Sequence, residues 1–270
     1  TPIWLNQAVW QADKIITINS VEPHYFAGFT GGRKSFIPGV AGLQTITANH
    51  KLALHPQAKT LALKNNPVHE DMTEITTMIP REIFSIQTVI NNEHKLHSIH
   101  YGDVFASFES AVNEAKKIFC VPIKNPVDIV IALIQPPYDI NFYQSQKAIE
   151  NAKLALKENG IMIVISKCRE GIGDDEFIKV LTATNDLQLI LNKLKEDFKL
   201  GYQKTAKLIE TLKYFEIWTV MPIAENIIKS VYMKPFIDPN YATEKALTLK
   251  GKNAQILIMS DASLTVPLLE

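Results

Sequence analysis

The feature that most constrains the fold is an alternation of strand-like and helix-like segments in the second half of the chain. The apolar, β-branched run DIVIALI begins at Asp128. Helix-like and strand-like segments then alternate over residues 143–157, 161–166, 174–181 and 216–221. Alternating strands and helices predict a parallel sheet with helices on its faces. We therefore expect an α/β domain over residues 123–250, whose first helix stops at Asn159-Gly160.

The first half of the chain predicts another α/β domain, over residues 1–122. Its expected elements are a buried strand at 14–21, a β-hairpin with arms at 83–90 and 95–101, and a helix at 104–118 capped by Asp103. A last strand-like run lies within residues 251–270, which we expect to return to this first domain. The predicted architecture is two α/β domains with a cleft between them, the second with a mostly parallel sheet.

Composition and charge favour a small-molecule partner. The chain has 270 residues with 28 basic and 28 acidic side chains, whereas proteins that bind nucleic acid or anionic membranes need a basic excess on one face. Its apolar runs are far shorter than the roughly 18 residues that span a bilayer, and we see no targeting segment. Cys120 and Cys168 form no Cys-x-x-Cys pair, so we expect no disulfide framework, no thiolate zinc site and a cytoplasmic location.

A glycine-rich segment at residues 22–50 is the first candidate for a functional loop. It holds five of the eleven glycines together with two histidines and a lysine, a composition typical of active-site loops. The run AGFTGGRKS nearly matches the phosphate-binding P-loop, but Arg33 stands where the second glycine is required and Pro38 interrupts any following helix. A looser anion site at the amides of Gly31 and Gly32, or a plain glycine turn, is the alternative.

The histidines alone form no metal-binding signature. His24 and His50 are 26 residues apart and His55 follows five residues later, spacings that match no zinc motif. In the expected hairpin only His94 and His100 could share a face, because residues three apart in a strand point to opposite sides. A structural or surface role is the simplest interpretation of these side chains.

The start of the first helix in the second domain is the other candidate site. The sequence NFYQSQK, residues 141–147, follows the carboxyl end of a strand, where open α/β sheets bind ligands. Gln144 and Lys147 are three residues apart and are therefore neighbours on the helix surface. The sequence CREGIG, residues 168–173, follows the next strand and could line the same crevice. A solvated first helical turn is the alternative interpretation.

The sequence EPHYFAGFTGGRKSFIPGVAGLQTITANH, residues 22–50, resembles the signature of the nickel-pincer lactate racemase family. The histidine, the glycine-flanked lysine and the Asn-His pair occur in the family's order and spacing. The resemblance continues through HP at His55 and NPVHEDM at residues 66–72, and the YQSQK, CREGIG and MSDASLTVP segments resemble the family's second domain. The resemblance covers essentially the whole chain, which begins with Thr1. The family proteins have an additional N-terminal stretch that this chain lacks.

This resemblance implies a cofactor and a set of site residues. In the family a pyridinium-derived pincer nucleotide holds nickel through sulfur donors and is attached to a lysine through a thioamide. Lys34 corresponds to that lysine, and His50 corresponds to the protein ligand of nickel, a suitable role because neutral imidazole binds Ni(II). His24 corresponds to one of two histidines that exchange a proton with the substrate hydroxyl, and the second lies in the absent stretch. The second-domain residues that correspond to contacts with cofactor and substrate are Tyr143, Gln144 and Lys147.

The implied activity is racemisation or epimerisation of a 2-hydroxy acid, lactate or a related acid, by an isomerase. The α-hydrogen can leave as hydride when a base takes the hydroxyl proton and an electrophilic carbon accepts the hydride, and a cationic Lys147 would hold the carboxylate. Arg33 stands where the family's lactate enzymes often have proline. We expect the chain to be inactive alone, to lack cofactor in some preparations, and to self-associate through surface left by the absent stretch. The alternatives are a non-catalytic or degenerate homologue that binds a nucleotide-like ligand, and a P-loop phosphotransferase.

Overall fold

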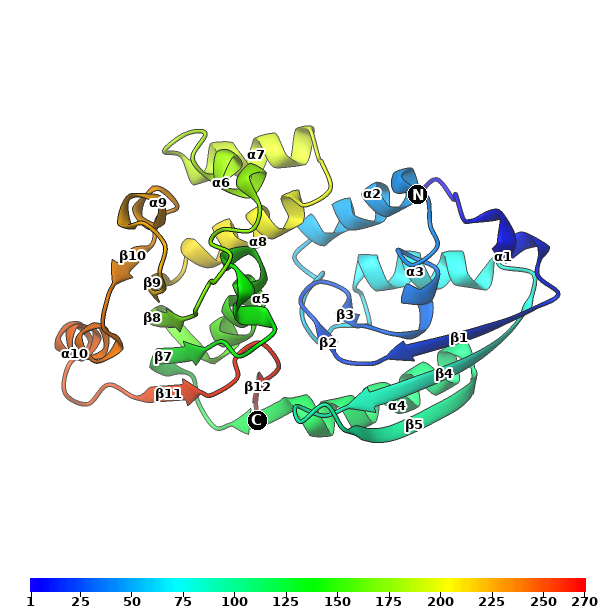
Figure 1. Ribbon diagram of the computed structural model, residues 1–270, viewed down its shortest axis with the longest axis horizontal. Coiled ribbons are helices and arrows are strands. Elements are labelled where there is room, and N and C mark those ends of the chain that lie inside the picture. Colours follow the sequence, from blue (N-terminus) through cyan, green and yellow to red (C-terminus); the bar gives the residue numbers. More distant parts are fainter. The chain divides into compact units, whose positions relative to one another are not determined.

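The computed structural model describes residues 1–270 apart from the side chain of Asp175, and the chain divides into two compact units. The first comprises Thr1–Cys120 and Phe198–Gln203, and the second comprises Val121–Asp197 and Lys204–Glu270. Each unit has its own sheet and its own hydrophobic core (Figure 1). Among the helices described, none combines the length and the apolar character that crossing a membrane requires.

The first unit is built on a three-stranded sheet. Its strands are β1 (Lys14–Ser20), β4 (Glu82–Ile90) and β5 (Leu96–Asp103), in the order β1-β4-β5. β1 is parallel to β4, and β4 is antiparallel to β5, which confirms the predicted hairpin. The helix α4 (Val104–Phe119) packs on β4 and β5, and the Asp103 carboxylate accepts hydrogen bonds from its first N–H groups, as predicted.

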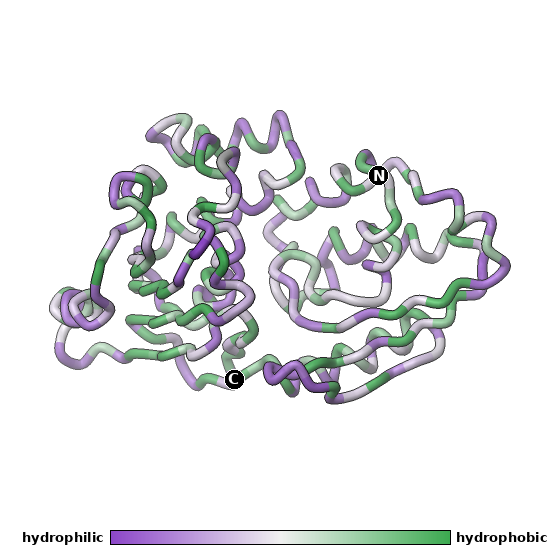
Figure 2. Tube along the Cα trace, in the orientation of Figure 1, coloured by the Kyte–Doolittle hydropathy of each residue, from purple (hydrophilic) through white to green (hydrophobic). Residues whose placement is uncertain are grey.

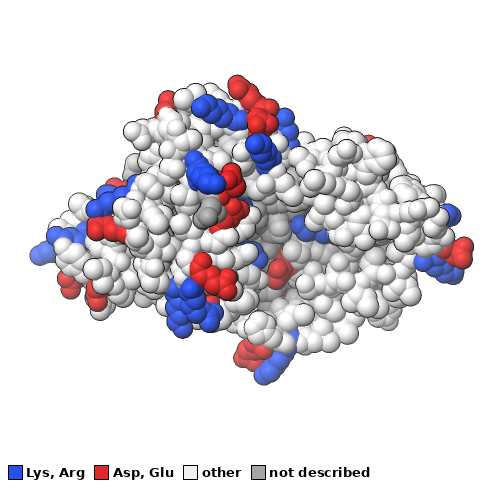
Figure 3. Space-filling view, turned by 45° about the horizontal axis from the view of Figure 1, so that its top comes forward, with Lys and Arg blue, Asp and Glu red and all other residues white. Residues whose placement is uncertain are grey.

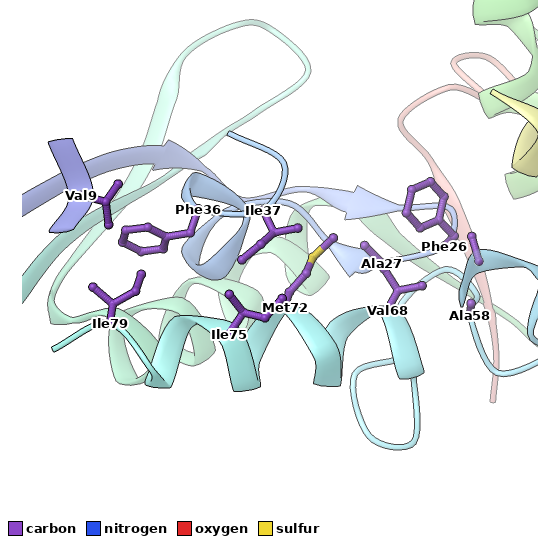
Figure 4. Close-up of a cluster of buried hydrophobic side chains, with 11 residues drawn as sticks. Val9, Phe26, Ala27, Phe36, Ile37, Ala58, Val68, Met72, Ile75 and Ile79 are labelled. Atoms are coloured by element: carbon purple, nitrogen blue, oxygen red, sulfur yellow. The ribbon is translucent and has the colours of Figure 1, made fainter. Parts of the chain in front are cut away.

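Short elements precede β1 or connect β1 to β4, and several of them contribute to the core of the unit. They are α1 (Gln7–Gln11), β2 (Pro23–His24), β3 (Gly28–Phe29), η1 (Gly32–Ser35), α2 (Leu43–Lys51), η2 (Leu52–Leu54) and α3 (Pro67–Thr77). Phe36 and Ile37, just after η1, pack among Met72, Ile75 and Ile79 (Figure 4). Phe36 and Ile37 therefore anchor the glycine-rich loop in the core of the unit.

β1 is not the buried strand that its composition predicts. Ile16 and Ile18 are 70% and 73% exposed, whereas Thr17 between them is buried and its hydroxyl lies 2.7 Å from that of Ser85. Successive strand residues point to opposite faces, so one face of β1 packs inward and the other meets solvent. The exposed face of β1 also carries isoleucines. A strand with apolar side chains on both faces is normally buried on both, and this is why the composition of β1 predicts a buried strand.

The second unit confirms the predicted parallel α/β architecture. Its strands lie in the order β10-β9-β8-β7-β11, and all four pairings are parallel. Their bounds are β7 (Val127–Leu133), β8 (Leu156–Ile165), β9 (Glu216–Val220), β10 (Lys234–Phe236) and β11 (Ile256–Met259). The helical elements are η3 (Tyr138–Ile140), α5 (Phe142–Ala152), η4 (Lys153–Ala155), α6 (Asp175–Leu181), α7 (Leu187–Glu196), α8 (Tyr202–Leu212), α9 (Glu225–Ser230) and α10 (Pro239–Lys250). The sheet strands are strongly apolar (Figure 2), as expected where helices cover a parallel sheet.

The expectation that residues 251–270 return to the first domain is wrong. β11 lies beside β7 in the five-stranded sheet, with Ile256 opposite Ile129, and β12 (Val266–Leu269) pairs with β6 (Cys120–Ile123). α10 ends at Lys250 and is followed by Gly251, whose φ of 90° suits a glycine, and the chain then re-enters the same sheet. A strand that follows a helix in an α/β unit most often joins the sheet which that helix covers.

The helix predicted over residues 143–157 ends earlier than its pattern indicates. α5 ends at Ala152, η4 follows it, and β8 already begins at Leu156. Asn159 and Gly160 therefore lie inside a strand and not at the end of a helix. The register of β8 against β7 shifts between Val127 and Ile129, and Asn159 has a φ of 61°. The Asn-Gly pair marks this irregularity in the strand pairing.

Candidate functional site

The glycine-rich loop of the first unit brings His24 and Lys34 together. β2 and β3 form a tight antiparallel pair with His24 opposite Gly28, and η1 then carries Lys34. Gly28 has a φ of 77°, and a Cβ there would lie 2.2 Å from the Ala62 carbonyl oxygen. Only glycine fits this position, so the close return of the loop depends on it.

His24 is held by the backbone and faces Lys34. Its Nδ1 accepts a hydrogen bond from the Ala27 N–H at 3.2 Å, and its Nε2 lies 3.4 Å from Lys34 Nζ. The Phe26 ring stands at the edge of the His24 ring, with centroids 4.5 Å apart, and Lys34 Nζ lies 5.7 Å from the centroid of Phe26. An imidazole held through one nitrogen presents the other for proton exchange.

His50 lies near the end of α2 with a buried, neutral imidazole. The side chain is 8% exposed, and burial, followed by the charge of a protonated Lys34, lowers its pKa to about 4. The nearby Ile46 backbone acts to raise this pKa, an effect smaller than those of burial and of Lys34. Nδ1 has no hydrogen-bond partner among the described atoms. The neighbouring Phe26 ring meets the imidazole edge to face at 5.1 Å. A neutral imidazole that keeps its lone pair is a suitable ligand for a transition metal.

Two asparagines, to which the sequence motifs assign no role of their own, anchor these elements. Asn49, next to His50, donates to the Val68 carbonyl and to Asp71 on α3 at 3.2 Å and 2.8 Å. Asn66 caps α3 and donates to the Phe26 carbonyl at 2.9 Å. The Asn66-Pro67 dipeptide is a helix-start signal that could have indicated this cap. Both side chains tie the loop and α2 to α3.

The loop does not form a P-loop. η1 is a four-residue 3-10 helix, so no α-helix N-terminus follows the glycines. The Gly32 N–H donates to Gln87 Oε1 at 3.0 Å and the Lys34 N–H donates to the Gly31 carbonyl at 3.1 Å. Because the Gly32 amide is already bonded within the protein, the alternative of a looser anion site at Gly31 and Gly32 lacks one of its two donors, and the other alternative, a plain glycine turn, needs neither.

The hairpin histidines do not form a metal site. His94 lies in the turn, with a φ of 59°, and not on the strand, so the one pair that could have shared a strand face, His94 and His100, does not do so. His100 bonds to the hydroxyls of Ser98 and Ser110 at 3.1 Å and 2.8 Å. Within the described part of the chain, no group of three or more His, Cys, Asp and Glu side chains could hold a metal ion by itself.

In the second unit, the start of α5 brings two aromatic rings and two lysines close together. Lys147 Nζ lies 4.0 Å from the centroid of the Tyr138 ring. Lys204, on α8, is 9% exposed, donates to the Tyr143 carbonyl at 2.8 Å, and its Nζ lies 3.5 Å from the centroid of the Tyr143 ring. Burial, and then the charge of Lys147, lowers the Lys204 pKa to about 7, while Asp174 acts in the opposite direction. Burial and Asp174 also raise the pKa of Tyr143.

The segments predicted to line one crevice do lie together. Carbonyls of Gly171 and Ile172, in CREGIG, accept the first N–H groups of α5, at 2.9 Å from Phe142 and 3.0 Å from Tyr143. The Asn141 carboxamide oxygen accepts the N–H of Gln144 at 2.9 Å. The CREGIG segment thus fixes the start of the helix that carries Tyr143, Gln144 and Lys147.

A cavity of about 940 Å³ lies at the carboxyl ends of β8, β9 and β10. Its lining includes Ser166, Lys167, Met221, Phe236 and Tyr241. This is the edge of the sheet at which open α/β folds bind ligands, whereas the α5 residues follow β7. On the face in Figure 3, basic and acidic side chains lie next to each other, and neither sign forms a broad area.

Two family domains match the chain. Residues 1–61 match the lactate racemase N-terminal domain, and residues 123–266 match the lactate racemase C-terminal domain. The lactate racemase of Thermoanaerobacterium thermosaccharolyticum is 30% identical over 265 residues, and that of Lactiplantibacillus plantarum is 29% identical over 267 residues. Each alignment covers 95% of this chain and 62% of the racemase. The chain therefore spans less than two thirds of the length of either relative.

Solved structures show the same fold. The lactate racemase apoprotein from Thermoanaerobacterium thermosaccharolyticum superposes with a TM-score of 0.91 at 29% identity, covering 98% of this chain and 65% of that one. A protein from Thermotoga maritima superposes with a TM-score of 0.73 at 17% identity, covering 100% of this chain and 70% of that one. At that identity the second likeness concerns the fold alone. Both domain matches confirm the family that the glycine-rich segment resembles.

Proposed function

Because the chain belongs to the lactate racemase family, we propose that it forms the cofactor-bearing part of an isomerase that racemises or epimerises a 2-hydroxy acid, lactate or a close analogue. The observation that carries this proposal is the loop of the first unit, which sets His24 Nε2 3.4 Å from Lys34 Nζ. A proton-exchanging imidazole beside a primary amine is what a hydroxy-acid site with a covalently held cofactor requires. The two named lactate racemases give further support.

The residues of the first unit fit a nickel-pincer nucleotide. His50 would bind the nickel ion, since its imidazole is neutral, buried and has an Nδ1 without a hydrogen-bond partner among the described atoms. Lys34 would carry the nucleotide through its amine. When bound, this cofactor supplies an electrophilic carbon that accepts a hydride from the α-carbon of the substrate.

The remaining roles belong to side chains of the protein. His24 would exchange the proton of the substrate hydroxyl through Nε2, with its ring orientation fixed by the Ala27 N–H. In the second unit, Lys147 would hold the substrate carboxylate, and Tyr143 and Gln144 would contact cofactor and substrate. Tyr143 and Gln144 lie in the first turn of α5, where the helix dipole favours anions, and Lys147 follows in the next turn. Loss of hydride gives a planar keto acid that can be reduced on either face.

The proposal is tested on protein made in cells that synthesise the cofactor. Intact mass and metal analysis should show an adduct and stoichiometric nickel, with the adduct on the peptide that contains Lys34. Chiral analysis of lactate after incubation should show racemisation when the missing part of the enzyme is supplied. Binding of adduct and nickel without turnover in that preparation would favour a non-catalytic homologue, and ATP hydrolysis would favour a phosphotransferase.

A small-molecule partner and a cytoplasmic location complete the proposal. The balance of 28 basic and 28 acidic side chains supports a small ligand. Cys120 and Cys168 are both free thiols, as expected in a reducing compartment.

A further inference from the structure

Arg33 is a fully buried cation without an acidic partner. The side chain is 1% exposed, and none of the described carboxylates forms an ion pair with it. Burial lowers its pKa only to about 9, so the guanidinium is charged at neutral pH. Its charge also reaches His69, where it is the second cause, after burial, of a pKa lowered to about 4. A buried unpaired charge is costly, and its presence calls for compensating contacts.

Those contacts are made to the loop in which Arg33 itself lies. Nη2 donates to the Ala27 carbonyl at 2.6 Å, and Nη1 donates to the Gly31 carbonyl at 3.2 Å. The guanidinium carbon lies 4.4 Å from the centroid of Phe108 on α4, and a Cβ on Gly32 would come within 2.9 Å of the same ring. The guanidinium group therefore fills the inside of the loop and rests on α4 through Phe108.

The two carbonyls belong to the peptides that hold His24 and Lys34. Ala27 donates its N–H to His24 Nδ1 at 3.2 Å, while its carbonyl accepts from Arg33. The Gly31 carbonyl accepts from both Arg33 and the Lys34 N–H. One planar group thus links the backbone that orients His24 to the backbone that begins the turn of Lys34. A lysine at position 33 has a single nitrogen and lacks this fork.

We propose that Arg33 is a positioning residue that fixes the distance between His24 and Lys34 by bridging the Ala27 and Gly31 carbonyls. It acts through these two peptides and touches neither reactive side chain in the proposal. Its relevance to racemisation rests on the proposed function, whereas the bridging itself is a property of the unloaded chain.

The experiment measures how strongly His24 senses Lys34. The 270-residue chain is prepared without cofactor, once with the native Lys34 and once as the Lys34→Gln variant. In each protein, NMR measures the pH at which His24 is half protonated, which is its titration midpoint. Removing the neighbouring ammonium should raise this midpoint in the parent chain, because a like charge at 3.4 Å disfavours the imidazolium. The same pair of measurements is then made with Arg33→Met and with Arg33→Lys. We expect the Lys34-dependent shift to shrink by half or more in both backgrounds.

Folding and charge are controlled separately. Arg81→Met is the matched control, since Arg81 also donates from its guanidinium to a backbone carbonyl, that of Trp10, but lies outside the loop; this variant should keep the full shift. Arg33→Lys keeps a cation and provides the measurement if Arg33→Met does not fold. An unchanged shift in a folded Arg33 variant would overturn the proposal. Because neither nickel nor turnover enters the readout, this result is independent of whether the chain proves to be part of a racemase.

Discussion

His50 has the environment that a protein ligand to nickel needs, because burial keeps its imidazole neutral over the physiological range. We expect His50→Ala to abolish nickel retention while leaving the fold intact, since the side chain lies near the end of α2 and its Nδ1 bonds to nothing in the described chain. Metal analysis after desalting checks this. His69→Ala is the matched control, since burial also lowers the His69 pKa to about 4. Stoichiometric nickel in the His50 variant would show that another group is the ligand.

Lys34 is expected to be the point of covalent attachment, since a thioamide of this kind forms on a primary amine. Lys34→Arg keeps the positive charge but removes that amine, so the mass adduct should disappear completely. Peptide mass mapping of protein from cofactor-producing cells makes the measurement, and Lys59→Arg, at an exposed position of the same unit, should retain the adduct. An adduct that persists on a different peptide would refute the assignment.

Lys204 should make stability depend on pH. The Lys204 pKa is about 7 in the folded chain, compared with 10.5 for an unperturbed lysine. Between these two pH values, Lys204 is protonated in the unfolded chain and neutral in the folded chain. The free energy of unfolding therefore rises with pH through this window, and up to about 4 kcal/mol is lost as the pH falls back to 7. Lys204→Met should remove this dependence. Urea unfolding across the window measures it, with Lys207→Met as control because that buried ammonium pairs with Glu210 at 3.2 Å.

A difference between the parent chain and Lys204→Met that stays constant with pH would contradict this prediction. The variant also loses the hydrogen bond to the Tyr143 carbonyl. That loss lowers the free energy of unfolding by the same amount at every pH. Only the slope reports the protonation of Lys204.

At the scale of elements, the sheet of the first unit presents an apolar outer face. Ile16 lies opposite Phe84, and Ile18 and Tyr101 both lie opposite Ile86. Ile16, Ile18 and Tyr101 are each at least 70% exposed, and Phe84 is 44% exposed. Antiparallel and mixed sheets can have one solvated face, but that face is usually polar. Contiguous apolar surface of this kind favours association.

We predict that the purified chain self-associates through this face with a second copy. Ile16→Thr together with Ile18→Thr should weaken the association by roughly tenfold or more, since burying each such side chain contributes about 1.5–3 kcal/mol. Sedimentation velocity over a range of concentrations measures the effect. Ile237→Thr is the control, because Ile237 is fully exposed in the second unit. Association that is unaffected by the double substitution would place the contact elsewhere.

The elements that the sequence predicted best are those specified by local signals. α4 follows from the Asp103 cap and its apolar spacing, and β7 and β8 follow from long β-branched runs. The end of α5 was mispredicted because the helical spacing runs past Ala152, and the pairing of β8 with β7 overrides it. Which sheet β11 joins depends on the packing of α10, which no local signal in its own sequence specifies.

For the molecule as a whole, sequence reasoning gave the candidate residues but not their environment. The approach of His24 to Lys34 depends on a glycine position and on the Arg33 bridge, and spacing in the sequence does not reveal either. In the sequence, Arg33 is visible as a break in a P-loop pattern and as a departure from the proline that the family's lactate enzymes often have, and nothing in the sequence marks Lys204. Both act through backbone carbonyls, and contacts of that kind leave no signature in residue type.

Proton exchange on both faces of a planar keto acid determines what this chain can do alone. His24 would serve one face, His50 is assigned to nickel, and the hairpin histidines bond to other side chains or lie in a turn. The chain spans 62% of the length of the two racemases it matches. If the second acid or base lies in the remaining part, the cofactor-loaded chain should racemise lactate roughly 10²- to 10⁴-fold more slowly than a form that includes that part. A chiral assay of both forms at equal nickel content measures this. Equal rates would show that a histidine of this chain, His55 or His69, serves the second face, and His55→Gln and His69→Gln would then identify it.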